Sequence, residues 1–534
     1  MKKYFYQREK IKLVLILFFV FYYNTLFAQK KEIVAYYHGN YSDRHIGHEK
    51  SLQSFDMFKY VTVLNYAFAV PWPDSNGVIL PKLTNEFFAY QKSYPGENSV
   101  DGIADVDSQA LKGQFNQLKK IKKLNPHLKI VISLGGWGGS TYFSDLALTP
   151  ESREIFVNAC IDLFIKGNLP QKNNSGGTNS AFGVFDGIDL DWEFPITGGP
   201  EGTHSNPNDR ENQTALFKLF REKLDEINPN FLLTAAVTGR SNEFWLYNFN
   251  EDQNYLNWFN LMSYDLHGIA DSYSSHHTNL LSSENDVDPK KESLDRMVRY
   301  LLDSVKVMPE KIVPGAAYYG KGWEDIDSNN NGLYQKGNFL NKWGYIGFKD
   351  YRDFKEVNDQ GFISYWDDNT LAPYLYNPKE KIFWSYDDLR SISLKSRYVD
   401  AFNLRGLMFW QIFGDDSLGN LTKTIFYKNM PDVKFNETNS KKSEISINFD
   451  SPKNLDEFKI GNNIILKVKY KEVIGKIKKA EFFVDESSIG YNTFEPFNWA
   501  WFNASEGEHT IQCIAYDQNG HTINSEKIKI LVKR

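Results

Sequence analysis

Apolar runs rich in β-branched and aromatic residues alternate with longer segments of helical periodicity along the first 430 residues. The apolar runs predict eight strands, at residues 32–38, 60–69, 128–134, 184–193, 231–237, 257–264, 311–319 and 405–411. The helical patterns between them lie at residues 109–124, 151–166, 207–227, 291–305 and 386–402. Eight mostly apolar strands that alternate with helices predict an α/β fold, the (β/α)8 TIM barrel.

The segments that connect these elements differ in length at the two ends of the predicted barrel. Those that lead from a helix into a strand are short, as at 125–127, 228–230 and 308–310, whereas those that leave the strands are long, at 70–108, 196–206, 266–289 and 320–385. Long segments at one face form a cleft, and in these barrels the functional site lies at the carboxyl ends of the strands. We therefore expect the site at this end.

Two further units are predicted outside the regular alternation. Residues 323–384 are rich in Tyr, Trp and Gly, and we expect them to form a small α+β insertion that makes one wall of the cleft. Residues 431–442 have the composition of a linker, which bounds a barrel domain at 29–430. About seven short alternating runs in 443–534 predict an all-β Ig-like sandwich, with Trp499 and Trp501 more in its core than on a sugar-binding surface.

Composition narrows the function classes. The net charge of -6 argues against a nucleic-acid partner, and the aromatic content of 16% suits stacking on flat apolar ligand faces such as sugar rings. Cys160 and Cys513 are far apart in the sequence, so no structural disulfide is expected. His276 and His277 are adjacent, and the other histidines show no metal-ligand spacing, so we expect neither a metal nor a cofactor. We also expect a monomer.

The first 28 residues have the pattern of an export signal. A basic start is followed by an apolar run at 13–23 and by Ala28 before Gln29, which predicts a cleaved secretory signal over 1–28. Secretion to the periplasm or the medium follows, with no membrane association after cleavage. Leu26 is larger than the residue usual three positions before a cut, so a retained anchor is the alternative.

The stretch 185–195 (FDGIDLDWEFP) carries the strongest chemical signal. Its period of two puts apolar residues on one face and carboxylates on the other: Ile188, Leu190 and Trp192 against Asp189, Asp191 and Glu193. Three acids about 6.6 Å apart along one face repel each other, so at least one is expected to have a raised pKa and to serve as a general acid. A solvated edge strand is the alternative. Asp186 has the other parity, and we expect it to form hydrogen bonds at the start of the strand.

The chain resembles the chitinases of glycoside hydrolase family 18 over about residues 31–427. Asp186, Asp189, Asp191 and Glu193 fit that family's DxxDxDxE signature. Further matching motifs are NYAFA at 65–69, SLGGW at 133–137, LLTAAV at 232–237, MSYD at 262–265, YYGKGW at 318–323 and GLMFWQ at 406–411. Stretches of 347–388 resemble the insertion of deep-cleft chitinases, and the tail resembles bacterial Ig-like modules of secreted glycosidases.

The resemblance implies a mechanism that the acids alone do not. By themselves, they suggest one carboxylic acid that protonates the leaving group and one carboxylate that attacks. The family instead uses the 2-acetamido oxygen of the substrate as the nucleophile, with retention of configuration. Glu193 would then act as acid and base, Asp191 would hold the acetamido group, and Asp189 would share its proton.

The resemblance also assigns substrate contacts. Tyr264 would bond the acetamido oxygen, with Met262 and Asp265 shaping the pocket, and Trp410 would form the floor beneath the sugar. Cleft-lining residues would be Tyr36, Phe68 and Trp137. Tyr36 and Phe68 could equally fill the barrel interior, Trp410 could be packing, and Asp265 could merely cap the following loop.

Lys321 departs from the family pattern, because arginine usually follows YG there. A lysine keeps the charge but loses the planar fork, so a bidentate contact with substrate is not expected. The leading interpretation is a secreted endo-acting chitinase that binds chitin or N-acetylglucosamine oligosaccharides. An endo-β-N-acetylglucosaminidase that acts on N-glycans is the enzymatic alternative, and a chitinase-like lectin without turnover is the other.

Overall fold

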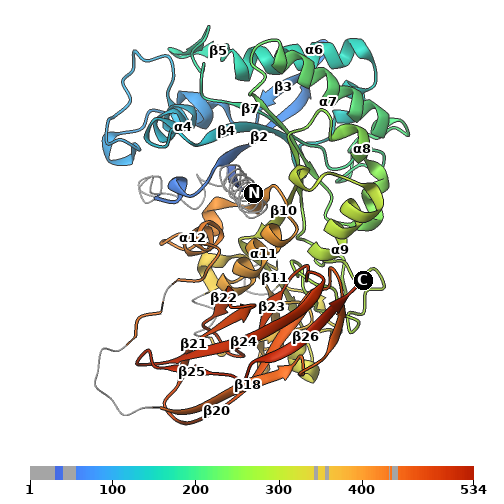
Figure 1. The fold of residues 1–534 in the computed structure, drawn as a ribbon. Helices are drawn as coiled ribbons and strands as arrows, with labels where there is room; N and C mark the ends of the chain where they lie inside the picture. The colour runs from blue at the N-terminus through green and yellow to red at the C-terminus, as the bar shows by residue number, and fades with distance from the viewer. Residues whose placement is uncertain (1–30, 40–55, 342–346, 355–359, 432, 436–442) are drawn as a thin grey trace, which may run out of the picture.

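The computed structural model describes residues 31–39, 56–341, 347–354, 360–431, 433–435 and 443–534. The predicted export signal and most of the predicted linker lie outside these residues. Figure 1 shows an α/β barrel followed by a module of β-sheets that packs against it. Within the described ranges, the helices are all too short or too polar to cross a membrane.

Eight parallel strands form the closed barrel that the sequence pattern predicts. Strand β1 pairs with both β2 and β17, which closes the ring. The strands are β1 (Glu32–His38), β2 (Val63–Pro73), β4 (Lys129–Gly135), β7 (Gly187–Asp191), β8 (Leu232–Val237), β9 (Trp258–Leu261), β10 (Ile312–Ala317) and β17 (Gly406–Trp410). Surrounding helices include α4 (Gly113–Leu124), α6 (Pro150–Cys160), α7 (Asp209–Asp225), α9 (Leu294–Arg299), α11 (Leu389–Ala401) and α12 (Asn420–Tyr427).

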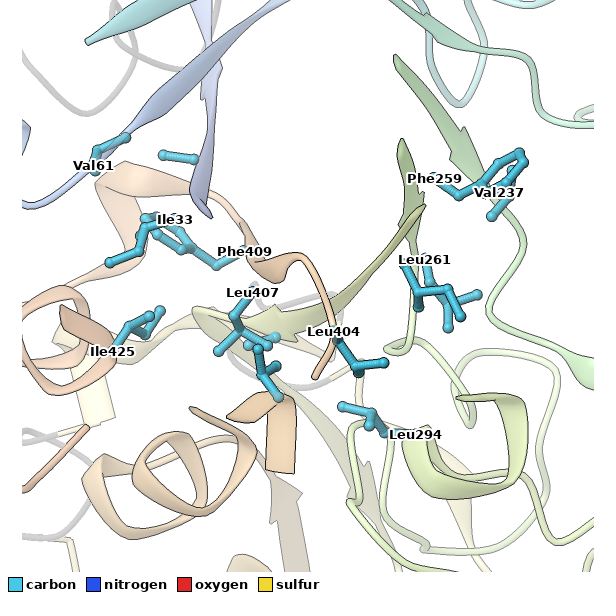
Figure 2. Packing of buried hydrophobic residues seen from close by; sticks show 14 of the residues in the cluster. Ile33, Val61, Val237, Phe259, Leu261, Leu294, Leu404, Leu407, Phe409 and Ile425 are labelled. Carbon is cyan, nitrogen blue, oxygen red and sulfur yellow. The ribbon is translucent and has the colours of Figure 1, made fainter. Parts of the chain in front are cut away.

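The alternation of side chains along the strands creates two separate apolar layers. In β1, Ile33 and Tyr37 belong to the outer layer between strands and helices, whereas Val34 and Tyr36 belong to the barrel interior. Figure 2 shows part of the outer layer, where Phe409 and other strand residues pack with residues of the surrounding segments. Burial of one such side chain contributes about 1.5–3 kcal/mol. The layers therefore determine which face of each strand points into the barrel.

Several strand boundaries differ from the sequence-based prediction, and one example is β9, which covers only Trp258–Leu261 of the predicted 257–264. Strand β7 covers only Gly187–Asp191 of the predicted 184–193. Its neighbour β4 ends at Gly135, so the Glu193 amide donates to Ser140 Oγ (3.0 Å) instead of to a strand. Strand β2 continues to Pro73 and pairs with β3 (Ile79–Leu83), which lies in the segment predicted as a long connection.

The described part of the insertion is an antiparallel sheet with short 3-10 turns. Its order is β12-β11-β16-β15-β14, and β13 also pairs with β11. The strands are β11 (Tyr319–Glu324), β12 (Asn338–Phe339), β13 (Phe348–Asp350), β14 (Ile363–Asp367), β15 (Ala372–Asn377) and β16 (Ile382–Ser385). The sheet begins at Tyr319, four residues before the predicted start of the insertion.

The C-terminal module has the two-sheet organisation expected of an Ig-like domain. One sheet has the order β18-β20-β23, and the other β19-β26-β24-β21-β22 with β25 beside β24. Its strands are β18 (Glu444–Ser451), β19 (Glu457–Lys459), β20 (Ile464–Ile474), β21 (Ile477–Val484), β22 (Ser487–Asn492), β23 (Trp499–Trp501), β24 (Gly507–Asp517), β25 (Thr522–Asn524) and β26 (Ile528–Lys533). Trp499 is fully buried and Trp501 half-buried. Cys160 and Cys513 are both buried and free.

Candidate active site

A cavity of about 710 Å³ lies at the carboxyl ends of the barrel strands. This volume is within the range of ordinary small-molecule sites. It brings together residues named from the sequence: Tyr36, Phe68, Trp137, Asp191, Glu193, Met262, Tyr264, Asp265, Lys321 and Trp410. Asp189 lies behind this lining and is fully buried.

Asp189 is held in the barrel interior by four polar side chains. Tyr36 Oη and Ser133 Oγ each donate to Asp189 Oδ2 at 2.8 Å. Thr234 Oγ1 and Asn260 Nδ2 donate to Oδ1 at 2.5 and 3.1 Å. Burial nevertheless raises the pKa of Asp189, although these hydrogen bonds oppose the rise. The strand register explains the contacts, since Ser133 and Thr234 are the neighbours of Asp189 on β4 and β8.

Asp191 and Glu193 form the part of the acid row that faces the cavity. Asp191 Oδ1 is buried and, within the described part of the chain, has no hydrogen-bond partner. Burial, followed by the charges of Glu193 and Asp189, raises the pKa of Asp191 well above its ordinary value. Burial and then the charge of Asp265 raise the pKa of Glu193 to about 8. A carboxyl group with this pKa holds its proton near neutral pH, as a general acid must.

Asp265 is a fixed anion beside these acids. Tyr319 Oη donates to Asp265 Oδ1 at 2.7 Å, and Lys321 Nζ and His277 Nδ1 lie 3.1 and 3.7 Å from the same oxygen. Burial alone would raise the pKa of Asp265, but contacts with His277, Lys321 and Tyr319 hold it well below its usual range. Lys321 therefore acts as a point charge next to Asp265.

Several aromatic side chains line the cavity. The Trp410 ring stacks on Phe68 with centroids 5.8 Å apart and lies 5.5 Å from the Tyr36 ring. Trp137 is 67% exposed, which leaves its ring free to stack on a ligand. Tyr264 Oη lies 3.7 Å from Met408 Sδ, within the interior cluster that Met262 also contacts. Such a lining suits a ligand with flat apolar faces and polar edges.

Asp186 lies away from the cavity, at the start of β7. Its Oδ2 accepts a hydrogen bond from the Ile130 amide (2.8 Å) and lies 2.7 Å from Lys122 Nζ. These contacts connect Asp186, the first acid of the stretch 185–195, to β4 and α4. Asp186 is not among the residues that line the cavity, so it does not contact a ligand bound there.

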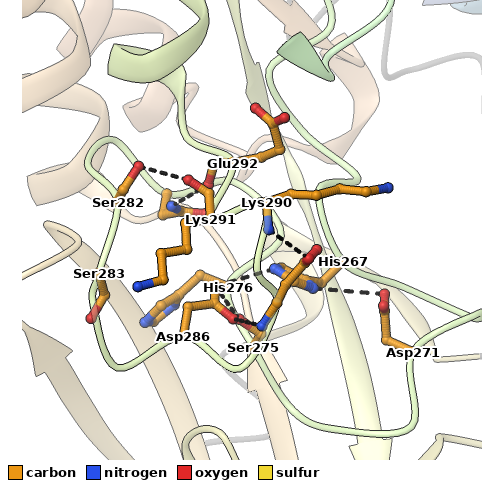
Figure 3. A network of polar contacts seen from close by, with 12 residues as sticks. His267, Asp271, Ser275, His276, Ser282, Ser283, Asp286, Lys290, Lys291 and Glu292 are labelled. Carbon is orange, nitrogen blue, oxygen red and sulfur yellow. Dashed lines mark hydrogen bonds and ion pairs between the residues drawn. The ribbon is translucent and has the colours of Figure 1, made fainter. Parts of the chain in front are cut away.

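The loop that follows β9 contributes residues that the sequence analysis did not name, including Ile269 and Asp271. His267 is buried between two carboxylates of this loop, Asp271 and Asp286 (Figure 3). Its Nδ1 lies 3.8 Å from Asp271 Oδ2, and its Nε2 lies 3.3 Å from Asp286 Oδ2. Burial opposes the charge of His267, but the two carboxylates raise its pKa to about 9. The two contacts of His267 therefore join distant positions of the same loop. Further lining residues are His38, Thr238, Glu243 and Phe348.

A signal for some of these residues exists in the sequence. Ser133, Thr234 and Asn260 are single polar residues within apolar strands, which a buried polar partner would explain. His267 carries no such signal, because its two partners lie in the same irregular loop. Among the residues that the structure describes, no group of three or more His, Cys, Asp or Glu side chains could hold a metal ion.

Comparisons with known proteins match both parts of the chain. The family model described as Glycosyl hydrolases family 18 matches residues 32–415, and that described as Bacterial Ig domain matches 446–512. Chitinase A1 of Niallia circulans is 33% identical over 423 residues, which cover 73% of this chain and 57% of that protein. The chain spans about half the length of the curated relatives it matches.

Solved structures of related proteins show the same architecture. The catalytic domain of psychrophilic chitinase B from Arthrobacter TAD20 has a TM-score of 0.69 at 29% identity, and the match covers 75% of this chain and 95% of that one. Chitinase ChiA74 from Bacillus thuringiensis has a TM-score of 0.64 at 25% identity, with 94% and 84% of the two chains covered. The second match includes the C-terminal module.

Proposed function

Because the chain belongs to glycosyl hydrolases family 18, we propose that it is a secreted chitinase that hydrolyses the β-1,4 linkages of N-acetylglucosamine polymers. The observation that carries the proposal is the row of acids that begins at Asp189 on the inward face of β7 and continues past the strand to Glu193, whose pKa burial and the charge of Asp265 raise to about 8. The relatives named as chitinases support the substrate class. The apolar run at 13–23 supports export.

In the proposed mechanism, Glu193 protonates the glycosidic oxygen and then, as a carboxylate, activates water. The substrate's 2-acetamido oxygen attacks the anomeric carbon, so that the configuration is retained and no protein carboxylate forms a covalent bond. Asp191 holds the acetamido N–H and stabilises the positive charge that develops. Its unpartnered, buried Oδ1 is available for that contact. Asp189 shares a proton with Asp191, so their titration belongs to the pair.

The remaining site residues orient the sugar. Tyr264 donates to the acetamido oxygen, while Met262 and Asp265 shape the pocket around that group. Trp410 lies under the ring of the reacting sugar, where its apolar face excludes water. Cleft contacts to neighbouring sugars come from Tyr36, Phe68, Trp137 and Lys321. Asp186 supports the strand and takes no part in the chemistry.

The shape of the cleft favours a linear polymer over an N-glycan core. Tyr319, Lys321 and Phe348 extend the cavity wall from the insertion sheet. A high wall along one side of the cleft suits a long, linear polymer that lies along it. We assign catalysis to 29–430, including the insertion at 323–384, and propose that 443–534 folds as an Ig-like domain after a linker at 431–442. The protein is proposed to act as a monomer without a cofactor or metal.

The substrate class is tested by offering two glycans to the same enzyme preparation. We expect the enzyme to release short oligomers from a hexamer of N-acetylglucosamine and to leave a high-mannose glycopeptide intact. Cleavage of the glycopeptide alone would replace the chitinase proposal by the endo-β-N-acetylglucosaminidase alternative. Binding of the hexamer without cleavage by the folded protein would favour the lectin alternative.

A further inference from the structure

The Ig-like domain shares a core with the barrel. A single hydrophobic cluster contains Phe502 and Trp499 of the domain together with Tyr398 of barrel helix α11. The Tyr398 and Phe502 rings meet edge to face, with centroids 5.4 Å apart. Figure 1 shows the strands of the domain lying against the side of the molecule where α9 and α11 are found. A domain connected only by a flexible linker would not share a buried apolar cluster with the barrel in this way.

A first set of polar contacts fixes the domain on helices α9 and α11. Asp295 of α9 accepts hydrogen bonds from Tyr398 Oη (2.8 Å) and from Asn463 Nδ2 of the domain (2.9 Å). Arg299 binds Asp295 and also donates from Nη2 to the Gly461 carbonyl at 2.7 Å. These bonds join one barrel helix directly to the edge of the domain.

A second set of contacts reaches the insertion. The Asn498 carbonyl accepts from Arg390 Nη2 of α11 at 2.9 Å, and Asn498 Nδ2 donates to Asp368 Oδ2 at 2.9 Å. Asp368 belongs to the turn between β14 and β15, and Lys467 Nζ lies 3.7 Å from the same carboxylate oxygen. The buried Arg390 guanidinium lies 3.7 Å from the centroid of the Trp366 ring, just before this turn. The domain therefore holds both the turn and the helix beside it.

The same turn supports the loop that lines the cleft. The Thr370 carbonyl accepts hydrogen bonds from the Leu280 and Leu281 amides at 3.1 and 3.0 Å. Asp367 Oδ2 lies 3.4 Å from His276 Nε2, and the next residue in the loop, His277, contacts Asp265. His276 appears in Figure 3 within this loop. The turn is thus contacted by the Ig-like domain at one residue and by the cleft loop at its neighbours.

We propose that the Ig-like domain is a buttress for the catalytic cleft: by holding the turn at 367–370, it positions the loop at 266–289 against the site. The domain thereby acts through Asp368, a positioning residue that touches no substrate. This support is separate from the proposed reaction, because it concerns what keeps the cleft wall in place. It also differs from a role as an independent substrate-binding module, which would need no contact with the turn.

Amide hydrogen exchange of the full chain tests the buttress without any substrate. Asp368→Ala removes the acceptor of Asn498 and Lys467 and is expected to speed exchange at the Leu280 and Leu281 amides about tenfold. Asn498→Ala, which breaks the contact from the other side, is expected to have the same effect there. Asp368→Asn keeps an acceptor oxygen and is expected to restore most of the protection.

The matched control is Asp450→Ala, because Asp450 forms an exposed ion pair with Lys453 within the Ig-like domain. Its exchange pattern at 280–281 is expected to equal that of the wild type. Unchanged exchange at these amides in both Asp368→Ala and Asn498→Ala would overturn the proposal. So would equal acceleration in the control, since the effect would then be a general loss of stability.

A kinetic measurement adds a functional readout that rests on the proposed chitinase activity. With a soluble N-acetylglucosamine oligomer, Asp368→Ala is expected to raise KM about 2- to 30-fold while kcat stays within about twofold. An unchanged KM together with faster exchange would show that the turn supports the loop without affecting the site, which contradicts the proposal. Absence of turnover in the wild type would reject the chitinase proposal alone, and the exchange result would still decide the buttress.

Discussion

Replacing Glu193 by Gln is expected to stabilise the folded protein at alkaline pH while it removes most turnover. The folded state raises the pKa of Glu193 from an ordinary value of 4.5 to about 8. A carboxyl group whose pKa is higher in the folded state destabilises that state as pH rises, because the unfolded state loses the proton more readily. The penalty is absent below the unfolded pKa, grows between the two values and is complete above the folded one. Glutamine has no charge to desolvate and avoids this penalty.

The size of the effect follows from the two pKa values. Full ionisation of Glu193 in its folded environment costs roughly 5 kcal/mol at about 1.36 kcal/mol per pH unit. At neutral pH the same arithmetic gives about 3 kcal/mol, because the folded carboxyl is still mostly protonated. Since Glu193 lines a cavity open to water, we reduce the expected gain to about 1–2 kcal/mol. Near pH 5 the expected gain in the free energy of unfolding falls to a few tenths of a kcal/mol, which is roughly a fifth of the gain near pH 8.

Thermal or urea unfolding at pH 5 and at pH 8 measures this difference directly. Glu193→Gln is expected to raise the midpoint by roughly 1–2 °C at the higher pH and hardly at all at the lower pH, because a gain of about 1–2 kcal/mol is spread over the large unfolding entropy of a chain of this length. Glu201→Gln, in an exposed loop, serves as the control and is expected to show no pH-dependent gain. The same gain at both pH values, or a loss at pH 8, would refute the claim that burial and Asp265 keep Glu193 protonated.

Three further predictions follow from the contacts of the site. The wild-type kcat/KM is expected to fall about tenfold per pH unit as pH rises through about 8, because Glu193 must carry its proton; initial rates that stay level to strongly alkaline pH would contradict this. Asp186→Ala is expected to lower the free energy of unfolding by about 1–3 kcal/mol with kcat within twofold, since it leaves the Ile130 amide without its acceptor. A fall in kcat at unchanged stability would place Asp186 in the chemistry. Lys321→Ala is expected to raise KM about 2- to 5-fold and Lys321→Arg to restore it, whereas an unchanged KM in the alanine variant would remove Lys321 from the binding site.

The period-two pattern carried most of the information about the barrel. It predicted β1 at its observed bounds, and it placed Asp189 and Asp191 on the face opposite to Leu190. Since the apolar face must be buried against helices, the acids could only point into the barrel. Such a pattern lies within a single strand, so it can be read from the sequence without knowledge of distant segments.

Contacts between distant segments could not be predicted in the same way. Asp265 owes its low pKa to His277, Tyr319 and Lys321, which reach it from a loop and from the insertion sheet. The end of β7 at Asp191 depends on where β4 stops, which no pattern within 185–195 contains. The packing of the Ig-like domain on the barrel likewise depends on residues of two separate units, such as Tyr398 and Phe502, and the pattern of neither segment identifies the other.

The central claim is that Glu193 is the proton donor of a chitin-cleaving site. The most direct measurement is hydrolysis of a hexamer of N-acetylglucosamine by the wild type and by Glu193→Gln, with binding of the hexamer measured in parallel. Short products of retained configuration are expected from the wild type, and the variant is expected to be slower by about 10²–10⁴ with binding preserved. Turnover by a folded Glu193→Gln protein at the wild-type rate would contradict the assignment of Glu193 as the proton donor.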